Sequence, residues 1–348
     1  MQFLFLTPDR KVHRGRVALL AAILPLFASG PRAAAQDTPL ISGAVGFFSS
    51  PNHTSTLQPV LSPLLAAPLG SHLLVESRGT LSGTFSSQTG ANGPYHEQFV
   101  ASLNYLQLDY IATSKLTIVG GKFLTPFGTY NERLTPIWLP NLANAPLILG
   151  IGITPSGYNN GGQVRGVLFS NDKVQLNYVA YGSGSSNLHE FASGRVAGYQ
   201  LAVYLPTHRL EVGTSYQRLL QGTHVNASGV HVWWLPYRVP LEVRSEYAHG
   251  ARSQGYWIEA AYRLSQWHGP DSLVGRLEPV FRMQQTFGSD GVPAVNKQEA
   301  DFGLDYHLPN VVRLNTSYGR SFASTGNANI WNFSLTYRFL FPAWKGHK

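Results

Sequence analysis

Charged side chains recur at even spacing along several segments in the second half of the chain. Glu242, Arg244 and Glu246 form one such row, and Glu259 and Arg263 share one parity in the next segment. Even spacing places side chains on the same face of an extended strand. Because residues of both signs share this face, the rows could line a polar passage that acts on ions, or pair across neighbouring strands to stabilise a wall.

The charges expected on this polar face are balanced in sign. Rings of a single sign select ions by charge, whereas a balanced set favours a polar pore with a local transverse field. We expect many of these charges to pair across strands and stabilise the wall. The bases are Arg78, Lys122, Arg165, Arg244, Arg263, Arg276, Arg282, Arg313 and Arg338, and the acids are Glu76, Glu211, Glu242, Glu246, Glu259, Glu278, Glu299, Asp301 and Asp305.

Other residue types that do chemistry show no usable spacing. The histidines are scattered without His-x-x-x-His spacing or a carboxylate neighbour on one strand, so no metal site is expected. The chain has no cysteine, which excludes thiolate ligands. Serine-rich residues 182–186 precede no helix, so they are not expected to hold phosphate. No nucleophile stands at readable spacing from a base. We expect no cofactor and no enzyme, although a triad assembled across strands stays open.

The elements that carry these residues are strands of alternating polarity. Short links such as 171–172 and 206–207 alternate with longer Gly- and Ser-rich links such as 183–193 and 220–227. This alternation is typical of an up-and-down transmembrane barrel, and a soluble sandwich would not separate its links so regularly. We predict an all-β, antiparallel, transmembrane barrel of fourteen strands, with sixteen as the alternative, from these segments: 71–85, 95–111, 115–124, 161–170, 173–182, 194–205, 208–219, 228–236, 240–248, 254–266, 272–287, 297–307, 310–321 and 328–341. In 95–111 the apolar parity switches, which indicates a bulge.

The last of these strands shows the pattern most clearly. From Trp331 to Phe341 the odd positions are all apolar or aromatic, and the even positions are Asn, Ser, Thr, Arg and Leu. Eleven residues are enough for a tilted strand to cross a bilayer. The segment resembles the closing strand of bacterial outer-membrane barrels. We expect its odd residues, including Phe339, to face lipid.

The two ends of the chain have other roles. Residues 1–35 combine a basic region, a short apolar stretch broken by Pro25 and three alanines, which predicts a signal peptide. Its removal lowers the formal charge from +8 to +4, so nucleic acid is not an expected partner. Residues 36–70 contain one strand-like piece followed by three prolines, and we expect a periplasmic lead-in or partial plug. The barrel is expected to occupy 71–341 and a tail 342–348.

The connection 125–160 is the longest in the chain, and loops of this length are usually functional. Its apolar stretches would be unusual in water. Folded into the barrel, they could pack on the wall and present Asn131, Glu132 and Arg133 to a pore. With Lys122 and Arg165 these residues form the predicted constriction. The alternative is a structural cap over the barrel mouth.

Three motifs resemble the phosphate-selective porin O and P family. They are residues 116–128 with the following Glu132, residues 277–282, and residues 303–314. The resemblance implies a trimeric, sixteen-stranded barrel narrowed by inward loops and basic residues. The chain departs from it in its fourteen strand candidates and in its few lysines. After the signal peptide these are only Lys115, Lys122, Lys173, Lys297, Lys345 and Lys348.

We therefore expect a passive diffusion channel for small polar or anionic solutes, including phosphate-type anions, in the bacterial outer membrane. Its partners would be outer-membrane lipid, the barrel-assembly machinery and, as the resemblance implies, two further copies of the chain. The alternative function is a fourteen-strand transporter for hydrophobic compounds, with residues 37–70 as an N-terminal hatch. The apolar loop favours this alternative, and the many charges of the polar face count against it.

Overall fold

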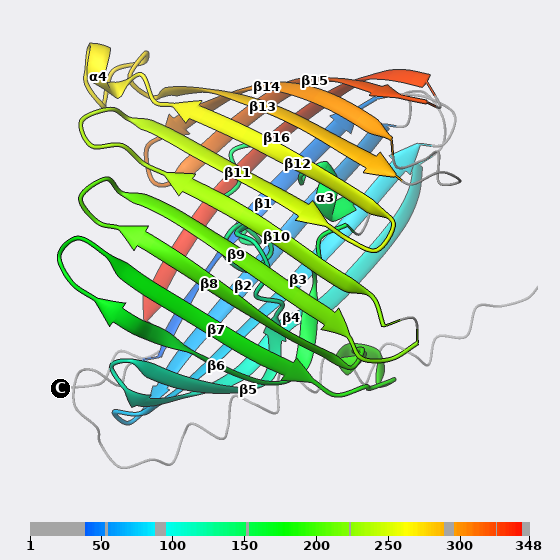
Figure 1. The fold of residues 1–348 in the computed structure, drawn as a ribbon. Helices are drawn as coiled ribbons and strands as arrows, with labels where there is room; N and C mark the ends of the chain where they lie inside the picture. Colours follow the sequence, from blue (N-terminus) through cyan, green and yellow to red (C-terminus); the bar gives the residue numbers. More distant parts are fainter. Residues whose placement is uncertain are drawn as a thin grey trace, which may run out of the picture. The chain divides into compact units, whose positions relative to one another are not determined.

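Sixteen antiparallel strands form a closed barrel in the computed structural model (Figure 1). Each strand pairs with its neighbours in sequence, and β1 pairs with β16 to close the sheet. The structure describes residues 39–52, 55–87, 95–150, 153–222, 224–288, 296–324 and 326–342. The strands are β1 (Leu40–Pro51), β2 (Ser55–Leu69), β3 (Leu73–Ser87), β4 (Tyr95–Thr113), β5 (Leu116–Leu124), β6 (Tyr158–Ser170), β7 (Gln175–Ser183), β8 (Val196–Leu205), β9 (Leu210–Leu219), β10 (Asn226–Trp234), β11 (Leu241–His249), β12 (Ser253–Tyr262), β13 (Leu277–Gly288), β14 (Lys297–Leu308), β15 (Val312–Ala323) and β16 (Gly326–Pro342).

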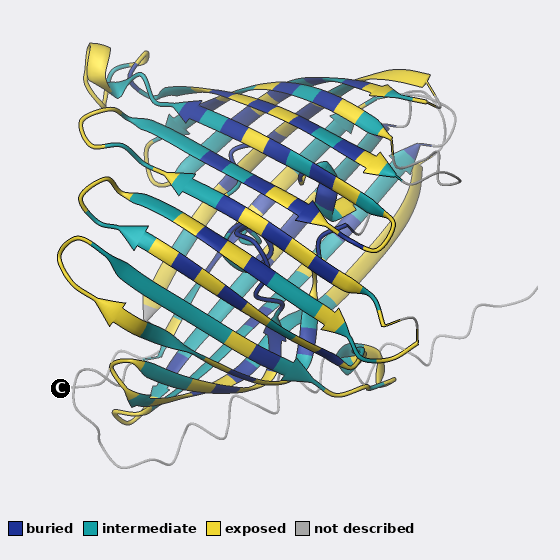
Figure 2. Ribbon diagram, viewed as in Figure 1, coloured by how far each residue is buried: buried dark blue, intermediate teal, exposed yellow. Residues whose placement is uncertain are grey.

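Polar side chains of the strands point into the barrel and apolar ones point outward. On β16, Ser334 and Thr336 are buried, whereas Phe333 and Leu335 are 40% and 39% exposed. The alternation covers most of the sheet as a chequered pattern of buried and exposed residues (Figure 2). A soluble sandwich would bury its apolar face instead. The apolar outer face is therefore built to contact lipid.

The strand number is sixteen, so the main prediction of fourteen was wrong and the alternative was right. The two missed strands, β1 and β2, arise from residues 40–69, which were expected to form a lead-in, plug or hatch. Prolines do not exclude β2 because its pairing with β3 is interrupted at 58–59 and 62–63, where Pro59 and Pro63 lie. Pairing with β1 continues through both positions. A proline that faces a gap in one ladder costs little.

The predicted bulge in the fourth strand is confirmed. Arg78 of β3 pairs with Tyr105 of β4, and Gly79 pairs with Leu103, so Asn104 is the extra residue. The extra residue reverses which side chains of β4 face inward. Gln107, which follows the bulge in sequence, therefore points into the barrel and is buried.

Most connections alternate between shorter turns and longer loops, and Leu40 of β1 and Pro342 of β16 pair on the side of the shorter turns. The turn-side links 235–240 and 263–276 are exceptions, because both are longer than the link 250–252 between them, and 263–276 contains the short helix α4 (Ser265–His268). On the other side, the longest connection carries α2 (Tyr130–Arg133) and α3 (Leu147–Gly150), and the β7–β8 link carries the 3-10 turn η2 (His189–Phe191). The predicted signal peptide 1–35 lies outside the described residues, as does the predicted tail apart from Pro342.

Among the described residues, no helix is both long enough and apolar enough to cross a membrane.

Candidate pore constriction

The chain between β5 and β6 runs through the barrel interior. Its apolar residues, among them Phe127 and Ile148, are fully buried in a cluster with Ala248 of β11 and Trp257 of β12. The ring of Tyr130 meets Trp257 edge to face at 6.2 Å. Burial of this apolar area removes it from water and fixes the segment against one wall. We call residues 125–157 the inward loop.

Backbone groups at the start of the inward loop are held by polar side chains of the wall. The Gly128 N–H donates to Ser215 Oγ at 3.0 Å, and Gln200 Nε2 donates to the Gly128 carbonyl at 2.7 Å. The Thr129 N–H donates to Glu246 Oε2 at 3.2 Å. Gly128 has φ +63°, and a Cβ there would lie 2.0 Å from Glu246 Oε1. Only glycine fits this close approach.

The tip of the inward loop reaches two other parts of the wall. Arg78 Nη2 of β3 donates to the Thr135 carbonyl at 3.3 Å, and Arg313 Nη2 of β15 donates to the Pro140 carbonyl at 2.6 Å. Backbone carbonyls of the tip thus accept from arginines on both sides of the β1–β16 closure. Together with its seat on β11 and β12, these contacts make the loop cross the lumen.

Asn131 ties the two ends of the inward loop together. Its Nδ2 donates to the carbonyls of Thr125 and Gly157 at 3.0 and 2.9 Å, and its Oδ1 accepts from the Gly157 N–H at 2.9 Å. The side chain is buried and its polar atoms are used within the loop. Asn131 therefore shapes the constriction and offers little to a solute.

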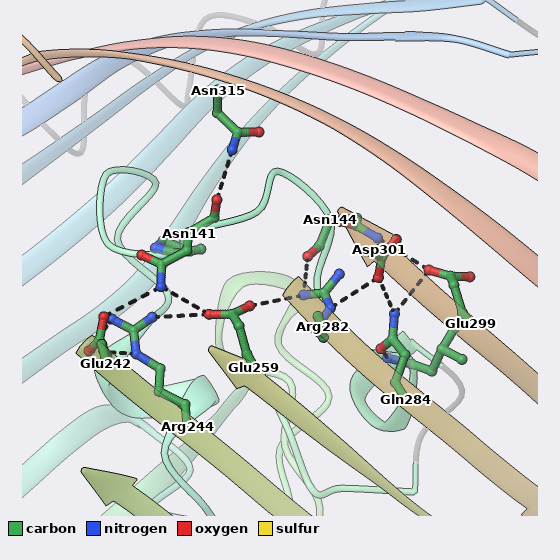
Figure 3. A network of polar contacts seen from close by, with 12 residues as sticks. Asn141, Asn144, Glu242, Arg244, Glu259, Arg282, Gln284, Glu299, Asp301 and Asn315 are labelled. Carbon is green, nitrogen blue, oxygen red and sulfur yellow. Dashed lines mark hydrogen bonds and ion pairs between the residues drawn. The ribbon is translucent and has the colours of Figure 1, made fainter. Parts of the chain in front are cut away.

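A continuous network of charges joins β11, β12 and β13 (Figure 3). Arg244 Nη2 lies 2.7 Å from Glu242 Oε1, and its Nη1 lies 3.7 Å from Glu259 Oε1. The other oxygen of Glu259 lies 3.7 Å from Arg282 Nη1. Asn141 of the inward loop donates to Glu259 Oε1 at 3.1 Å, so the network also holds the loop. These charges compensate one another on the wall.

The network continues onto β14. Arg282 Nε donates to Asp301 Oδ2 at 3.2 Å, and Gln284 Nε2 donates to the same oxygen at 2.8 Å and to Glu299 Oε1 at 3.0 Å. Asn144 of the inward loop donates to that Glu299 oxygen at 3.3 Å. Removing one partner of a buried ion pair strongly destabilises the folded protein, because the other charge is left uncompensated. This part of the wall is a structural support for the loop.

A second charged group lies where β4 and β6 face helix α2. Arg165 is paired with Asp109, and its Nη1 lies 3.8 Å from Glu132 Oε1. Gln107 Nε2 donates to Asp109 Oδ1 at 2.9 Å. Burial raises the pKa of the Glu132 carboxyl above its ordinary value, and the guanidinium groups of Arg165 and Arg133 act in the opposite direction. Three charges of both signs therefore meet at α2.

Arg133, next in sequence, points to another strand. Its Nη1 lies 2.7 Å from Glu211 Oε1 of β9, and the same oxygen lies 3.3 Å from His231 Nε2 of β10. The guanidinium also lies 5.8 Å from the ring centre of Trp233. Arg133 keeps a third of its side-chain surface exposed, so it can act on passing ions.

Lys122 is fully buried beneath the β7–β8 link. Its Nζ donates to the Glu190 carbonyl and lies 3.5 Å from the centre of the Tyr158 ring. The Phe191 ring centre is 5.7 Å away. A lysine covered in this way is held by cation–π contact and is closed to solutes.

Two arginines flank Trp138 at the tip of the inward loop. The guanidinium carbon of Arg78 lies 5.6 Å from the Trp138 ring centre, and that of Arg338 lies 5.9 Å from it. Arg78 donates to Ser62 Oγ and to a backbone carbonyl, which are both neutral. In the described part of the chain, neither arginine has a carboxylate within ion-pair distance. The positive charge of both arginines is therefore left uncompensated at the tip of the inward loop.

A half-open cavity of about 350 Å³ separates the inward loop from the closure of the barrel. Phe48 of β1, Ser334 of β16 and Arg313 of β15 line it from the wall. Ile137 and Leu149 line it from the loop. The lumen therefore keeps space on the side of β1, β15 and β16.

The predicted constriction residues do not form one ring. Glu132 and Arg133 face different strands, and of the five predicted residues only Glu132 and Arg165 meet directly. Arg263 and Arg276 lie in the turn-side link 263–276, because β12 and β13 are shorter than predicted. Arg263 stays near Glu278 of the inner face, whereas Arg276 pairs with the exposed Asp271 and is a correction to the predicted pore lining. Of the other predicted wall residues, those whose side chains have partners on the inner face are Arg78, Glu242, Arg244, Glu246, Glu259, Glu278, Arg282, Glu299, Asp301, Asp305 and Arg313, and Arg338 approaches Trp138.

Sequence reasoning missed several residues of the site. Asp109 was hidden by the bulge, which reverses the parity of β4. Trp138 looked like part of an apolar stretch, and Asn141 and Asn144 carried no periodic signal. The partners of the asparagines are more than one hundred residues away in sequence. Glu211 was expected on the polar face, but its contact with α2 was not.

Solved structures of outer-membrane proteins resemble this chain. Salmonella typhi OmpF, in complex with daunomycin, has a TM-score of 0.56 at 12% identity, covering 88% of this chain and 99% of its own. Pseudomonas putida OprB, at low pH, has a TM-score of 0.56 at 10% identity, covering 96% and 100%. The chain has the fold of the outer-membrane porins.

The likeness to porins extends over nearly the full length of those chains. In vitro folded OmpT, an outer-membrane protein of Vibrio cholerae, has a TM-score of 0.52 at 10% identity, covering 86% of this chain and 96% of its own. No protein-family model matches the sequence, and no curated protein matches it. The porin fold is therefore established by structure alone.

Proposed function

We propose that this chain is a bacterial outer-membrane porin, a passive diffusion channel for small polar solutes and not an enzyme. The observation that carries the proposal is the inward loop, which crosses a sixteen-strand lumen and leaves a cavity of about 350 Å³ beside β1, β15 and β16. Barrels of this size leave an aqueous channel unless it is plugged. A hydrophobic-compound transporter with an N-terminal hatch is not proposed, because residues 40–69 are wall strands.

The porin would prefer anions, including phosphate-type anions. Most inward-facing bases of the described wall are compensated by carboxylates, but Arg78 and Arg338 are not. Both lie at Trp138, next to the free side of the lumen. An unpaired positive charge in a narrow passage of low dielectric attracts anions and repels cations. The exposed Arg338 would contact passing anions, whereas Arg78, which is 2% exposed, would act only through its electric field. Lys122 is not proposed, because the Glu190 carbonyl and the Tyr158 ring cover it.

The proposed cellular setting follows from the porin reading. Residues 1–35 would direct export, the barrel-assembly machinery would insert the barrel, and the outward apolar face would contact outer-membrane lipid. A homotrimer is the assembly that the family resemblance implies. The assembly machinery, the lipid contact and the homotrimer are proposed, and the porin fold does not depend on them.

Planar-bilayer recording of the purified barrel tests the proposal. Steady ohmic conductance is expected, with a reversal potential on the anion side in a salt gradient. Inorganic phosphate should reduce the chloride current by competing at the exposed Arg338. The double variant Arg78→Gln/Arg338→Gln should shift the reversal potential toward cations. Lys173→Gln, at an exposed turn, is the matched control and should leave it unchanged.

Two results separate the parts of the proposal. Absence of ohmic conductance from correctly folded barrels would overturn the porin reading. Ohmic conductance with an identical reversal potential in the double variant would keep the channel and remove the two arginines from its selectivity.

A further inference from the structure

The outward face of the barrel carries a groove of about 270 Å³ across the turn-side ends of β11 to β14. Ala260 lies opposite Phe281 in the β12–β13 register, so a short side chain stands beside a large one. Phe281 and Phe302, with ring centres 4.9 Å apart, form one side of the groove. Leu241 and Tyr262 form the other side. The hollow is therefore mostly apolar along its walls.

The turn-side end of the groove is marked by an aromatic side chain at the barrel rim. Link 263–276, with helix α4, projects from this end of the barrel (Figure 1). Trp267 of α4 is 69% exposed, and its ring centre lies 6.1 Å from that of Tyr262. Tyr262 Oη donates to Gln266 Oε1 at 3.3 Å. Exposed tryptophan beside tyrosine is typical of the boundary between hydrocarbon and water.

The same rim is positively charged. Gln266 donates to the carbonyl of Arg238, so α4 is bound to the exposed β10–β11 turn. The exposed Arg209 lies 5.7 Å from the ring centre of Tyr237 in that turn. Links 206–209, 235–240 and 263–276 together carry four arginines against the single acid Asp271. Arg276 lies 3.9 Å from Asp271, and Arg263 lies near Glu278, so among the described residues Arg209 and Arg238 are the uncompensated charges of the rim. This charge is complementary to an anionic head group.

The short turns of outer-membrane barrels lie on the periplasmic side, where the inner leaflet is. We propose that this groove binds one anionic phospholipid of that leaflet. An acyl chain would lie over Ala260 between Tyr262 and Phe281, and the phosphate would lie near Arg238, with Trp267 at the level of the ester groups. The proposal rests on the proposed function for its membrane setting. It goes beyond general contact with lipid, because it assigns one site a head-group preference.

Native mass spectrometry of the purified, delipidated full barrel tests this site. Titration with phosphatidylglycerol should give one bound lipid at lower concentration than phosphatidylethanolamine. Arg238→Gln should weaken phosphatidylglycerol binding about tenfold, as expected for the loss of one charge-assisted contact, and leave phosphatidylethanolamine binding unchanged. Ala260→Leu fills the groove and should weaken binding of both lipids.

Two control variants show whether the effects are specific to this groove, and a conductance measurement tests the porin function separately. Lys173→Gln is a basic residue at another turn on the same side, and Ala180→Leu fills an exposed position on β7; neither should change lipid binding. Equal affinity of the wild type for the two lipids would overturn the proposal, as would unchanged binding in Arg238→Gln or Ala260→Leu. Single-channel conductance of the same preparation reports the porin function independently of lipid binding.

Discussion

Arg313 Nη2 of β15 donates to the carbonyl oxygen of Pro140 at 2.6 Å and is one of the wall side chains that hold the tip of the inward loop. The same guanidinium lies 3.8 Å from Asp305, which is buried. One residue thus links the loop tip to the charge balance of the wall. Such contacts keep the inward loop in place, and a fixed loop gives the proposed pore a constant size.

Arg313→Ala should loosen the tip of the inward loop. The variant loses a hydrogen bond to a charged donor, worth about 1.5–3 kcal/mol, and leaves Asp305 without its cation. We expect a lower free energy of unfolding and larger current fluctuations in single-channel recordings. Arg313→Lys keeps the charge, so its free energy of unfolding and its current fluctuations should lie between those of the wild type and Arg313→Ala. Current noise equal to wild type in Arg313→Ala would show that the tip is held by other contacts.

Gly128→Val should displace the start of the inward loop. A side chain there would collide with Glu246, and the left-handed backbone costs a non-glycine residue about 1–3 kcal/mol. Because the loop would lose its seat on β8, β9 and β11, single-channel conductance should rise. Gly150→Ala is the control, since a Cβ at that position meets no atom within 4 Å. Equal conductance in both variants would contradict a role of the seat in setting pore size.

The strands could be predicted because their information is local. Period-two alternation identified β3 to β16, and the parity switch identified the bulge at Asn104. β2 was missed because three prolines outweighed its alternation, and only the register shows that Pro59 and Pro63 face gaps in one ladder. A single sequence cannot reveal such a gap, because it depends on which strand lies alongside.

The contacts of the constriction could be predicted only in part. Glu132 and Arg133 were expected in the inward loop, but adjacent residues on a short helix point to different strands, β6 and β9. The pair of Arg313 and Pro140 spans 173 positions. Which wall a loop meets is decided by packing across the lumen, and local patterns carry no signal for it.

Arg133→Ala should shift ion selectivity toward cations. The variant removes a partly exposed base and leaves Glu211 with only His231 as a neighbour on the same oxygen. A gain in net negative charge in a narrow passage favours cations. The reversal potential in a salt gradient measures the change. The double variant Arg133→Ala/Glu211→Gln restores the balance and should return close to the wild-type value. A reversal potential that stays at the wild-type value in the single variant would place Arg133 outside the ion path.

Phe339→Asp should impair assembly more than stability. Phe339 stacks on Phe341 with ring centres 5.5 Å apart near the end of β16. A charge near a membrane interface costs only about 0–1 kcal/mol, but β16 must pair with β1 to close the barrel. The yield of the heat-modifiable folded form should fall. Phe339→Leu is the conservative control and should assemble normally. Wild-type yield of the Asp variant would show that this side chain does not face lipid during assembly.

Lowering the pH should make the pore more selective for anions, in part through Glu132. Burial raises the pKa of its carboxyl above the ordinary 4.5, so it becomes neutral at a higher pH than an exposed glutamate. Neutralisation leaves the positive charges of Arg133 and Arg165 less compensated, which favours anions. In Glu132→Gln this part of the shift should be absent, while shifts from other carboxylates remain. Reversal potentials measured in steps from neutral to acidic pH give the difference between the two proteins. A difference that is absent, or that develops only below pH 4.5, would contradict the role of Glu132 in this response.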